Sequence, residues 1–241
     1  TYIRNVTISA NISVQPLTLL ERKGCGENYD SIALSSPNGG LLTVIITAAP
    51  ALFPHNLPYD VSFNIATNGT FYMNSFPEGS YTFYTKDICN QERTPTYSLT
   101  GYHSGGRIDV ISNCGAFDLN MNFSDNAANQ SNLYWLQKFN PVTSQWVHPL
   151  TGVLYPPNSL PNVTNSYALA NMAMNYNIAT TGTFRILARY SYYDNDTPQL
   201  ISCIEPIKTF DYTGELKIIS AYAIPCINGG SQVFIITNGT P

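Results

Sequence analysis

Short runs in which apolar and polar residues alternate occupy most of the chain. They predict β-strands, because successive side chains of a strand point to opposite faces of a sheet. Turn signals, among them Asn68-Gly69 and the Pro-Asn-Gly-Gly run at 37–40, separate these runs. In the first hundred residues we predict strands at 17–20, 31–35, 41–48, 60–66, 70–74 and 80–86. Strands this short and this closely spaced indicate a β-sandwich or a barrel.

The second half of the chain follows the same pattern with one interruption. Residues 133–139 and 145–147 predict a hairpin around a turn at 140–144. The stretch 148–161 that follows contains too many prolines for a central strand, so we expect it on the surface. Residues 166–176 fit a short helix and an alternating strand equally well. The remaining runs predict strands.

A short motif of one apolar strand, a polar corner and a cysteine, here called the opening motif, occurs three times, which indicates a tandem array. Its copies are 17–20 before Cys25, 108–111 before Cys114, and 216–219 before Cys226. A second repeated element, a glycine followed by an apolar strand and then a cysteine, lies downstream. Its copies are 79–83 before Cys89 and 182–186 before Cys203.

These repeats divide the chain into units. We predict that residues 1–14 are the last strand of a preceding unit and that 214–241 begin a further one. Between them we expect two complete immunoglobulin-like domains, 15–104 and 105–213, the second with the proline-rich insertion. Trp135 is the candidate core tryptophan of the second domain. The predicted fold class is therefore all-β, a tandem of disulfide-linked immunoglobulin-like sandwiches, and we expect the chain to be part of a longer protein.

The cysteines fall into pairs within the predicted units. The cysteine of the opening motif and one late cysteine in each unit predict the disulfides Cys25–Cys89 and Cys114–Cys203. Cys226 would then be unpaired within this stretch, with its partner in a later part of the chain. Disulfides indicate an oxidising compartment, although five reduced, buried thiols in a cytosolic protein are the alternative. The chain has no Cys-x-x-Cys or His-x-His spacing, so we predict no zinc site.

Composition supports an extracellular β-protein and narrows the function. Hydrophobic residues make up 44% of the 241 residues, enough for cores, but charged residues only 11%, with 17 tyrosines. The net charge of −4 disfavours a nucleic-acid partner, which would need a basic face. No apolar run reaches the roughly 18 residues of a membrane-spanning helix.

With the glycine-led strands at 79–83 and 182–186, the cysteines of the opening motifs and the hairpin at 135–141, the chain resembles repeat regions of giant cell-surface adhesins of the Bacteroidota. The gliding-motility adhesins exported by the type IX secretion system are similar in kind. The resemblance covers nearly the whole chain, and its motifs specify architecture more than function. It implies an outer-membrane-anchored, extracellular filament that attaches to surface polysaccharide or a solid substrate, with neighbouring repeats and the secretion or motility machinery as partners.

We therefore predict a non-catalytic repeat segment that forms a stalk and mediates attachment or gliding, with no cofactor. Two alternatives are a carbohydrate-binding module of a secreted polysaccharide-degrading enzyme and a subunit of a surface filament. The chain contains no Gly-x-Ser-x-Gly, P-loop or His-Glu-x-x-His motif, so an enzyme is the minority interpretation. Asp194 and Asp196 could contribute calcium ligands, but a solvated turn fits them better, and we predict no metal site.

The insertion, taken as a whole from about residue 140 to 165, holds the candidate contact residues Trp146, His148 and Tyr155, because recognition in a strand-rich array must come from loops or exposed edges. The alternative is that this loop folds onto its own domain and merely caps it. Asp30-Ser31-Ile32 resembles the O-glycan acceptor of Bacteroidota secreted proteins, which makes Ser31 a candidate glycosylation site. The tyrosines at 190, 192 and 193 could stack a sugar, but core packing is the preferred interpretation.

Overall fold

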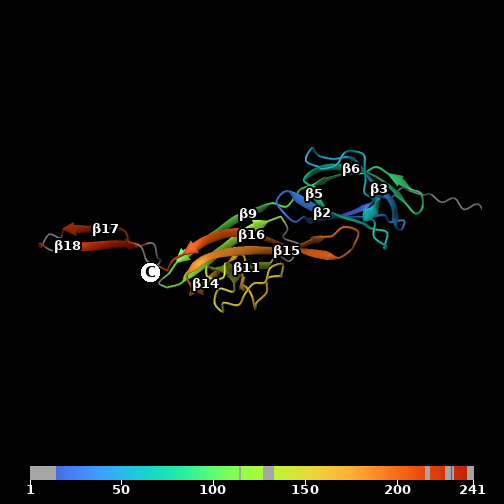
Figure 1. Ribbon diagram of the computed structural model, residues 1–241. Helices are drawn as coiled ribbons and strands as arrows, with labels where there is room; N and C mark the ends of the chain where they lie inside the picture. Colours follow the sequence, from blue (N-terminus) through green and yellow to red (C-terminus); the bar gives the residue numbers. More distant parts are fainter. Residues whose placement is uncertain are drawn as a thin grey trace, which may run out of the picture.

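The computed structural model describes residues 15–113, 115–126, 133–214, 218–225, 229 and 231–237. Its strands form three groups along the chain, and within each group all strand pairs are antiparallel. Figure 1 shows the first group beside the second, and the last two strands as a hairpin beyond the second. The prediction of an all-β protein is confirmed: among the described residues the one helical element is a single 3₁₀ turn. No described helix is long and apolar enough to cross a membrane.

The first group, here called the first sandwich, consists of two sheets. One sheet has the order β1-β2-β5 and the other the order β4-β3-β6-β7, with β8 also paired to β6. The elements are β1 (Thr18–Lys23), β2 (Tyr29–Ser35), β3 (Leu41–Ala48), β4 (Tyr59–Asp60), η1 (Ser62–Asn64), β5 (Phe71–Pro77), β6 (Gly79–Asp87), β7 (Glu92–Arg93) and β8 (Thr96–Leu99). The strand predicted at 60–66 is wrong beyond its first residue: β4 ends at Asp60, and the chain then turns through η1.

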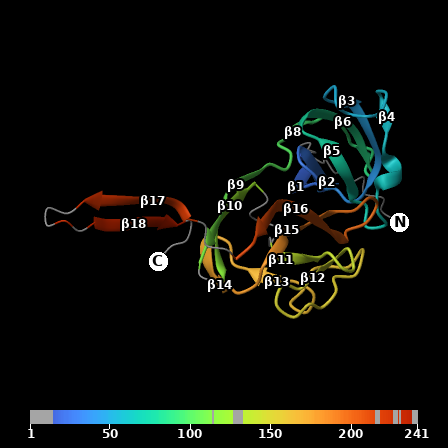
Figure 2. The ribbon, with the colours of Figure 1, turned by 60° about the vertical axis from the view of Figure 1, so that its left-hand side comes forward.

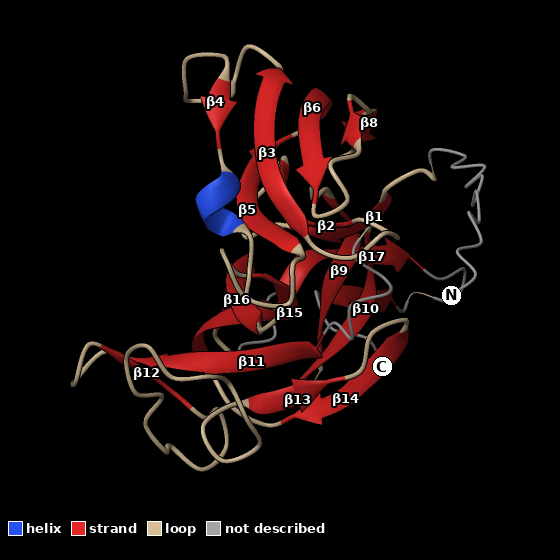
Figure 3. Cartoon of the chain, turned by 90° about the vertical axis from the view of Figure 1, so that its right-hand side faces the viewer, coloured by secondary structure: helices blue, strands red, loops and turns tan. Residues whose placement is uncertain are grey.

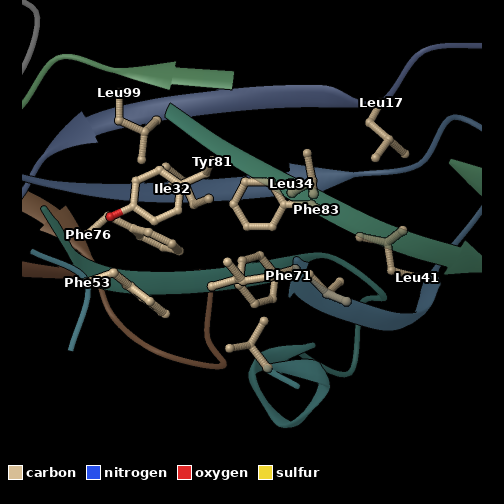
Figure 4. Close-up of a cluster of buried hydrophobic side chains, with 13 residues drawn as sticks. Leu17, Ile32, Leu34, Leu41, Phe53, Phe71, Phe76, Tyr81, Phe83 and Leu99 are labelled. Atoms are coloured by element: carbon tan, nitrogen blue, oxygen red, sulfur yellow. The ribbon is translucent and has the colours of Figure 1, made fainter. Parts of the chain in front are cut away.

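A single apolar core holds these two sheets together (Figure 4). Strand β6 shows the reason, because its alternate residues Tyr81, Phe83 and Thr85 are buried while those between them are partly exposed. Phe76 meets Tyr81 edge to face with 5.1 Å between ring centroids, and Phe71 meets Phe83 at 6.4 Å. The alternation seen in the sequence therefore produces the two-layer packing directly.

Asp87, fully buried at the end of β6, organises the neighbouring loops. Its carboxylate accepts a hydrogen bond from Arg93 Nη1 at 2.8 Å, one from the Ser36 hydroxyl at 2.8 Å, and the backbone N–H groups of Cys89 and Gln91 at 3.0 Å each. Burial by itself raises the pKa of Asp87, but these bonds, that of Arg93 first, outweigh it and lower the pKa to about 2.

The second group, here called the second sandwich, repeats this plan. Its sheets have the orders β14-β10-β9 and β12-β11-β15-β16, with β13 also paired to β11. The strands are β9 (Ser104–Ser112), β10 (Phe117–Asp125), β11 (Leu133–Asn140), β12 (Gln145–Val147), β13 (Tyr167–Leu169), β14 (Ala173–Ile178), β15 (Gly182–Tyr193) and β16 (Leu200–Tyr212). A separate core fills it, including Phe117, Leu136, Phe184 and Ile186. Residues 166–176, ambiguous in the sequence, form parts of two strands, with Met172 between them at φ 54°.

Trp135 does not join this core. Its neighbours Tyr134 and Leu136 do, so Trp135 lies on the opposite, outer face of β11. It is nevertheless only 7% exposed, and no described residue accepts a hydrogen bond from its indole nitrogen. Trp135 is therefore buried, as expected of a core tryptophan, but it lies outside the apolar core between the two sheets because its position falls on the other face of the strand.

The two glycine-led strands of the repeat have a structural cause. Gly79 opens β6 at φ 136° and Gly182 opens β15 at φ 134°, a backbone region that residues with a Cβ rarely enter. A Cβ at Gly79 would lie 2.8 Å from Pro50 Cβ, and one at Gly182 would lie 3.0 Å from Lys138 Cε. Glycine is therefore needed at the same point of both sandwiches.

The third group is a hairpin of β17 (Ile218–Pro225) and β18 (Ser231–Thr237), which projects beyond the second sandwich (Figure 2). It exposes apolar side chains, among them Tyr222, which stacks on Phe234 with 5.3 Å between centroids. In both sandwiches the first hairpin pairs with a third strand, β5 or β14, whereas the sheet of β17 and β18 has two strands among the described residues.

Candidate functional site

The feature that sets the two sandwiches relative to each other is the far end of the β15–β16 hairpin. This end extends past the sheet of the second sandwich and lies against β1, β2 and β5 of the first (Figure 3). We call this contact the junction. The linker between the sandwiches, residues 100–103, runs beside it.

A disulfide crosses the junction. Cys25, in the turn between β1 and β2, is bonded to Cys203 on β16, 178 positions later, with 5.3 Å between the Cα atoms. The predicted disulfides Cys25–Cys89 and Cys114–Cys203 are therefore both wrong. Cys89 carries a free, exposed thiol, whose Sγ lies 3.4 Å from the Asn38 carbonyl oxygen. Cys114 and Cys226 lie outside the described residues, so the prediction that Cys226 is unpaired stays a prediction.

The failed pairing has a simple physical reason. The repeats pointed to Cys25 and Cys203 as disulfide cysteines, but the sequence contained no sign that β15 and β16 continue beyond their own sheet. That extension brings Cys203 to the first sandwich, where it meets the cysteine of the first opening motif.

Tyr190 of β15 forms the centre of the junction. Its side chain is 2% exposed, and its ring stacks on the linker residue Tyr102 with centroids 4.7 Å apart and an interplanar angle of 19°. The Tyr190 hydroxyl donates to the Gly24 carbonyl oxygen at 3.0 Å and accepts from the Gly26 N–H at 3.3 Å. One side chain thus satisfies two backbone groups of the turn that carries Cys25.

Tyr193 makes a second contact on the other face of the same strand. Its ring lies 5.6 Å from the Tyr72 ring, and the Arg22 guanidinium is 5.5 Å from its centroid. Its backbone N–H donates to the Ser31 hydroxyl at 3.0 Å. Ser31 is fully buried, and its hydroxyl also donates to the Arg22 carbonyl oxygen. The folded chain therefore has no room for a glycan at Ser31, which corrects that prediction.

The turn of the hairpin, residues 194–199, completes the junction rather than standing in solvent alone. Asn195 Oδ1 accepts a hydrogen bond from the Asn74 N–H at 2.9 Å, and the Asp196 N–H donates to the Tyr72 carbonyl oxygen at 3.2 Å. Asp194 Oδ1 accepts from the N–H of Asn195 at 2.8 Å. Among the described residues no group of three His, Cys, Asp or Glu side chains could hold a metal ion.

The linker itself is fixed by charged groups. The Gly101 N–H donates to the carboxylate of Asp30, and Lys23 Nζ lies 3.1 Å from the other oxygen of this carboxylate. Burial raises the pKa of Asp30 to about 6, although both of these partners favour the ionised form. His103 bridges two glutamates of the first sandwich, with Nε2 at 2.8 Å from Glu78 and Nδ1 at 3.5 Å from Glu27.

An open groove of about 800 Å³ lies on the outer face of β15 and β16. Its floor includes Leu187, Ser202 and Ile204, and the proline-rich insertion forms a wall through Tyr155 and residues 158–160. The insertion therefore folds onto the side of its own sheet, as in the capping alternative, and the junction contacts come from other residues. None of the described residues that line the groove is acidic, and its one charged group is Arg185.

Arg185 sits between two aromatic rings of the insertion. Its guanidinium carbon is 4.2 Å from the centroid of the Trp146 ring and 5.6 Å from that of Tyr155, and Nε donates to Gln137 Oε1 at 2.8 Å. Burial lowers the pKa of Arg185, an effect that Tyr155 opposes. Burial also raises the pKa of Tyr155, against the influence of Arg185 and of its own hydrogen bond to the Ser159 carbonyl.

The three predicted contact residues have different places. Tyr155 lines the groove. Trp146 packs against the Arg185 guanidinium, and its ring centroid also lies 5.4 Å from that of Phe139. His148 is 7% exposed, lines a separate hollow and has a structural role. Its Nδ1 accepts the N–H groups of Leu150 and Thr151 at 3.2 Å each, and burial lowers its pKa.

Sequence reasoning missed Arg185. It lies in the repeated strand at 182–186, which was assigned to packing, and its orientation follows from the alternation that buries Phe184 and Ile186. A lone cation on the outer face of such a strand was the available signal.

Comparison of the chain with protein-family models, curated proteins and solved structures found no match.

Proposed function

We propose that this chain is a rigid, non-catalytic segment of an extracellular surface adhesin, in which the two sandwiches act as one body. The observation that carries the proposal is the disulfide Cys25–Cys203 across the junction. A bond that joins two domains fixes their relative orientation, which suits a stalk that must hold a binding region away from a cell surface. It also requires an oxidising compartment, which agrees with an extracellular location.

The contacts around the disulfide support the same proposal. An ordinary interface between consecutive domains permits relative motion unless it is both large and hydrophobic. Here Tyr190 is buried against Tyr102, and the partly buried Tyr193 packs against Tyr72, so the covalent bond is combined with aromatic packing and hydrogen bonds to the backbone. We assign the sandwiches to the immunoglobulin-like class on their two-sheet packing and antiparallel pairing, although the disulfide lies between them and not within either one.

The hairpin β17–β18 extends this arrangement. Its exposed Tyr222, Ile224 and Phe234 would form an apolar face for a further sheet. We propose that it begins a third sandwich, so that neighbouring repeats are the first partners of this segment. Attachment to a cell-surface polysaccharide or solid substrate, and the Bacteroidota source with its type IX secretion, remain proposals that rest on the sequence resemblance.

A second candidate function, a carbohydrate-binding module of a secreted polysaccharide-degrading enzyme, is favoured by one observation. The groove beside the insertion offers Tyr155 as a stacking ring next to the Arg185 guanidinium. An adhesin segment could also bind its ligand in this groove, so the groove does not separate the two candidates. They differ in whether the junction must be rigid.

Rigidity can be measured with spin labels at two exposed positions, one in each sandwich. Leu52 and Val163 are each 74% exposed and can be changed to cysteine after Cys89, Cys114 and Cys226 are replaced by serine. Pulsed electron paramagnetic resonance should give one narrow distribution of the distance between the two spin labels.

Replacing Cys25 and Cys203 by serine as well should broaden that distribution, because only the linker and noncovalent contacts then hold the junction. A broad distribution while the disulfide is intact would contradict the proposed stalk.

A further inference from the structure

Three arginines follow one another along the outer face of β15 and its continuation into the junction. Arg185 and Arg189 are four residues apart on the same face of the strand, which places them about 13 Å apart along it. Arg22 of the first sandwich joins the row at the other end, where its Nη1 donates to the Ser191 hydroxyl at 3.3 Å. The row therefore runs from the groove to the junction.

These cations have no acidic partner among the described residues. The ion pairs of the described chain involve other basic side chains, and Arg189 donates through Nε to the Ser202 hydroxyl at 3.2 Å. Asp211, on the same pair of strands, instead accepts a hydrogen bond from the Thr183 hydroxyl. In a chain with a net charge of −4, three arginines without an acidic partner among the described residues form a local positive surface that can attract an anionic ligand.

The orientation of Arg185 indicates what it can bind. Gln137 accepts the hydrogen bond from its Nε, and the Trp146 ring centroid lies 4.2 Å from its guanidinium carbon, so the two Nη groups are the donors left for a ligand. No described residue accepts a hydrogen bond from either Nη group. Such a planar pair of donors matches the two oxygens of a carboxylate.

The rest of the groove suits a sugar. Tyr155 presents a ring beside Arg185, and Asn158, Gln199 and Ser202 supply amide and hydroxyl groups to the lining. We propose that the groove and the arginine row bind a polysaccharide rich in uronic acids, with one carboxylate at Arg185, a sugar ring on Tyr155, and further carboxylates toward Arg189 and Arg22. This site deepens the attachment role proposed above, and it rests on that role for an extracellular ligand.

The carboxylate can be tested with one polymer in two forms. Polygalacturonate carries the charge on every sugar, whereas its fully methyl-esterified form keeps the chain and removes the charge. Isothermal titration of the purified 241-residue chain, with the disulfide intact, should show binding to polygalacturonate that weakens as salt is raised. The ester should bind at least about tenfold more weakly, because the charge-assisted hydrogen bonds are lost.

The variant Arg185→Gln should weaken polygalacturonate binding by a similar factor. Arg189→Gln, which leaves the stack with Trp146 intact, should weaken it by a smaller factor and keeps the test valid if the first variant unfolds. The matched control is Arg107→Gln on β9, which removes the same charge from an 80% exposed side chain already paired with Asp109. It should change the affinity by less than about twofold.

Four results would overturn the proposal: no binding of polygalacturonate, equal binding of the ester, an equal loss of affinity in Arg107→Gln, or tighter binding of dextran sulfate. The last would show a general polyanion surface and not a carboxylate site. The spin-label distances report on the junction and this titration reports on the groove, so either proposal can fail while the other holds.

Discussion

Tyr190→Phe removes one hydroxyl from the junction and keeps the aromatic stack on Tyr102. In the native chain that hydroxyl satisfies the buried Gly24 carbonyl and the Gly26 N–H. The phenylalanine ring fills the same space but forms neither bond, so the Gly24 carbonyl loses this partner. A buried polar group without a partner costs about 1–3 kcal/mol, and we expect the free energy of the junction contact to fall by this amount.

The assay uses the position of the two tryptophans. Trp135 and Trp146 are the only ones in the chain and both belong to the second sandwich, so tryptophan fluorescence follows that sandwich during urea unfolding. Near-ultraviolet circular dichroism follows tyrosines of both sandwiches. We expect the two transitions to coincide in the native chain and to separate in Tyr190→Phe. The m values of the two separate transitions should add up to the m value of the single native transition.

The matched control is Tyr212→Phe. The Tyr212 hydroxyl donates to the carbonyl oxygens of Asn113 and Ala116 inside the second sandwich, away from the junction. This variant should lower the midpoint of the second sandwich without changing how it is coupled to the first. If Tyr190→Phe shifts neither transition by more than about 0.5 kcal/mol, the reasoning that the hydroxyl stabilises the junction is refuted.

The remaining predictions concern single groups. The ionised Asp87 contributes about 2 kcal/mol to the free energy of unfolding above pH 5, because its pKa falls from 3.8 in the unfolded chain to about 2 in the folded one. This contribution should disappear as the pH falls from about 4 to about 2. In Asp87→Asn the free energy of unfolding should therefore depend less on pH in this acid range. Burial lowers the pKa of His148, so its neutral form stabilises the insertion above pH 6.5. The protection factor of the Leu150 amide, which is corrected for the intrinsic pH dependence of exchange, should fall as the pH drops below 6.5, and a constant protection factor would contradict this. The native protein should react with a thiol reagent at Cys89 without denaturant, and protection there would show that it is paired. Intact-mass analysis of the peptide with Ser31 should show no glycan, because the hydroxyl is buried.

The alternation of apolar residues was sufficient to predict an all-β chain and many of its strands. The strands predicted at 31–35 and 41–48 lie in β2 and β3, and the glycine-led repeats are β6 and β15. These predictions succeed because side-chain burial alternates along a strand and because glycine is required at two equivalent positive-φ positions.

The junction could not be predicted in the same way. Tyr190 follows the same alternation as the core residues of β15, but the linker and the first sandwich bury it, whereas Tyr193 lies on the opposite face and packs against Tyr72 of the first sandwich. The local pattern indicates that a side chain is buried and says nothing about which surface covers it. For the same reason the Cys25–Cys203 pairing, which depends on how far a hairpin extends, was missed in favour of pairings within repeats.

The groove could be predicted from the sequence in part. Tyr155 was predicted as a contact residue because it lies in an insertion, and it does line the groove. Arg185 reaches the same place from a regular strand, and only the folding of residues 155–160 over the outer face of that strand brings the two together. Contacts between a loop and a sheet far apart in sequence depend on tertiary structure, which a single sequence does not reveal.

The central claim, that one disulfide joins the two sandwiches, is tested most directly by peptide mapping without reduction. The native chain, alkylated at low pH and digested, should release a linked pair of peptides that contain Cys25 and Cys203, and reduction should separate them. Cys89 should appear alkylated in an unlinked peptide. A linked pair of Cys25 with Cys89 would place the bond within the first sandwich and contradict the account.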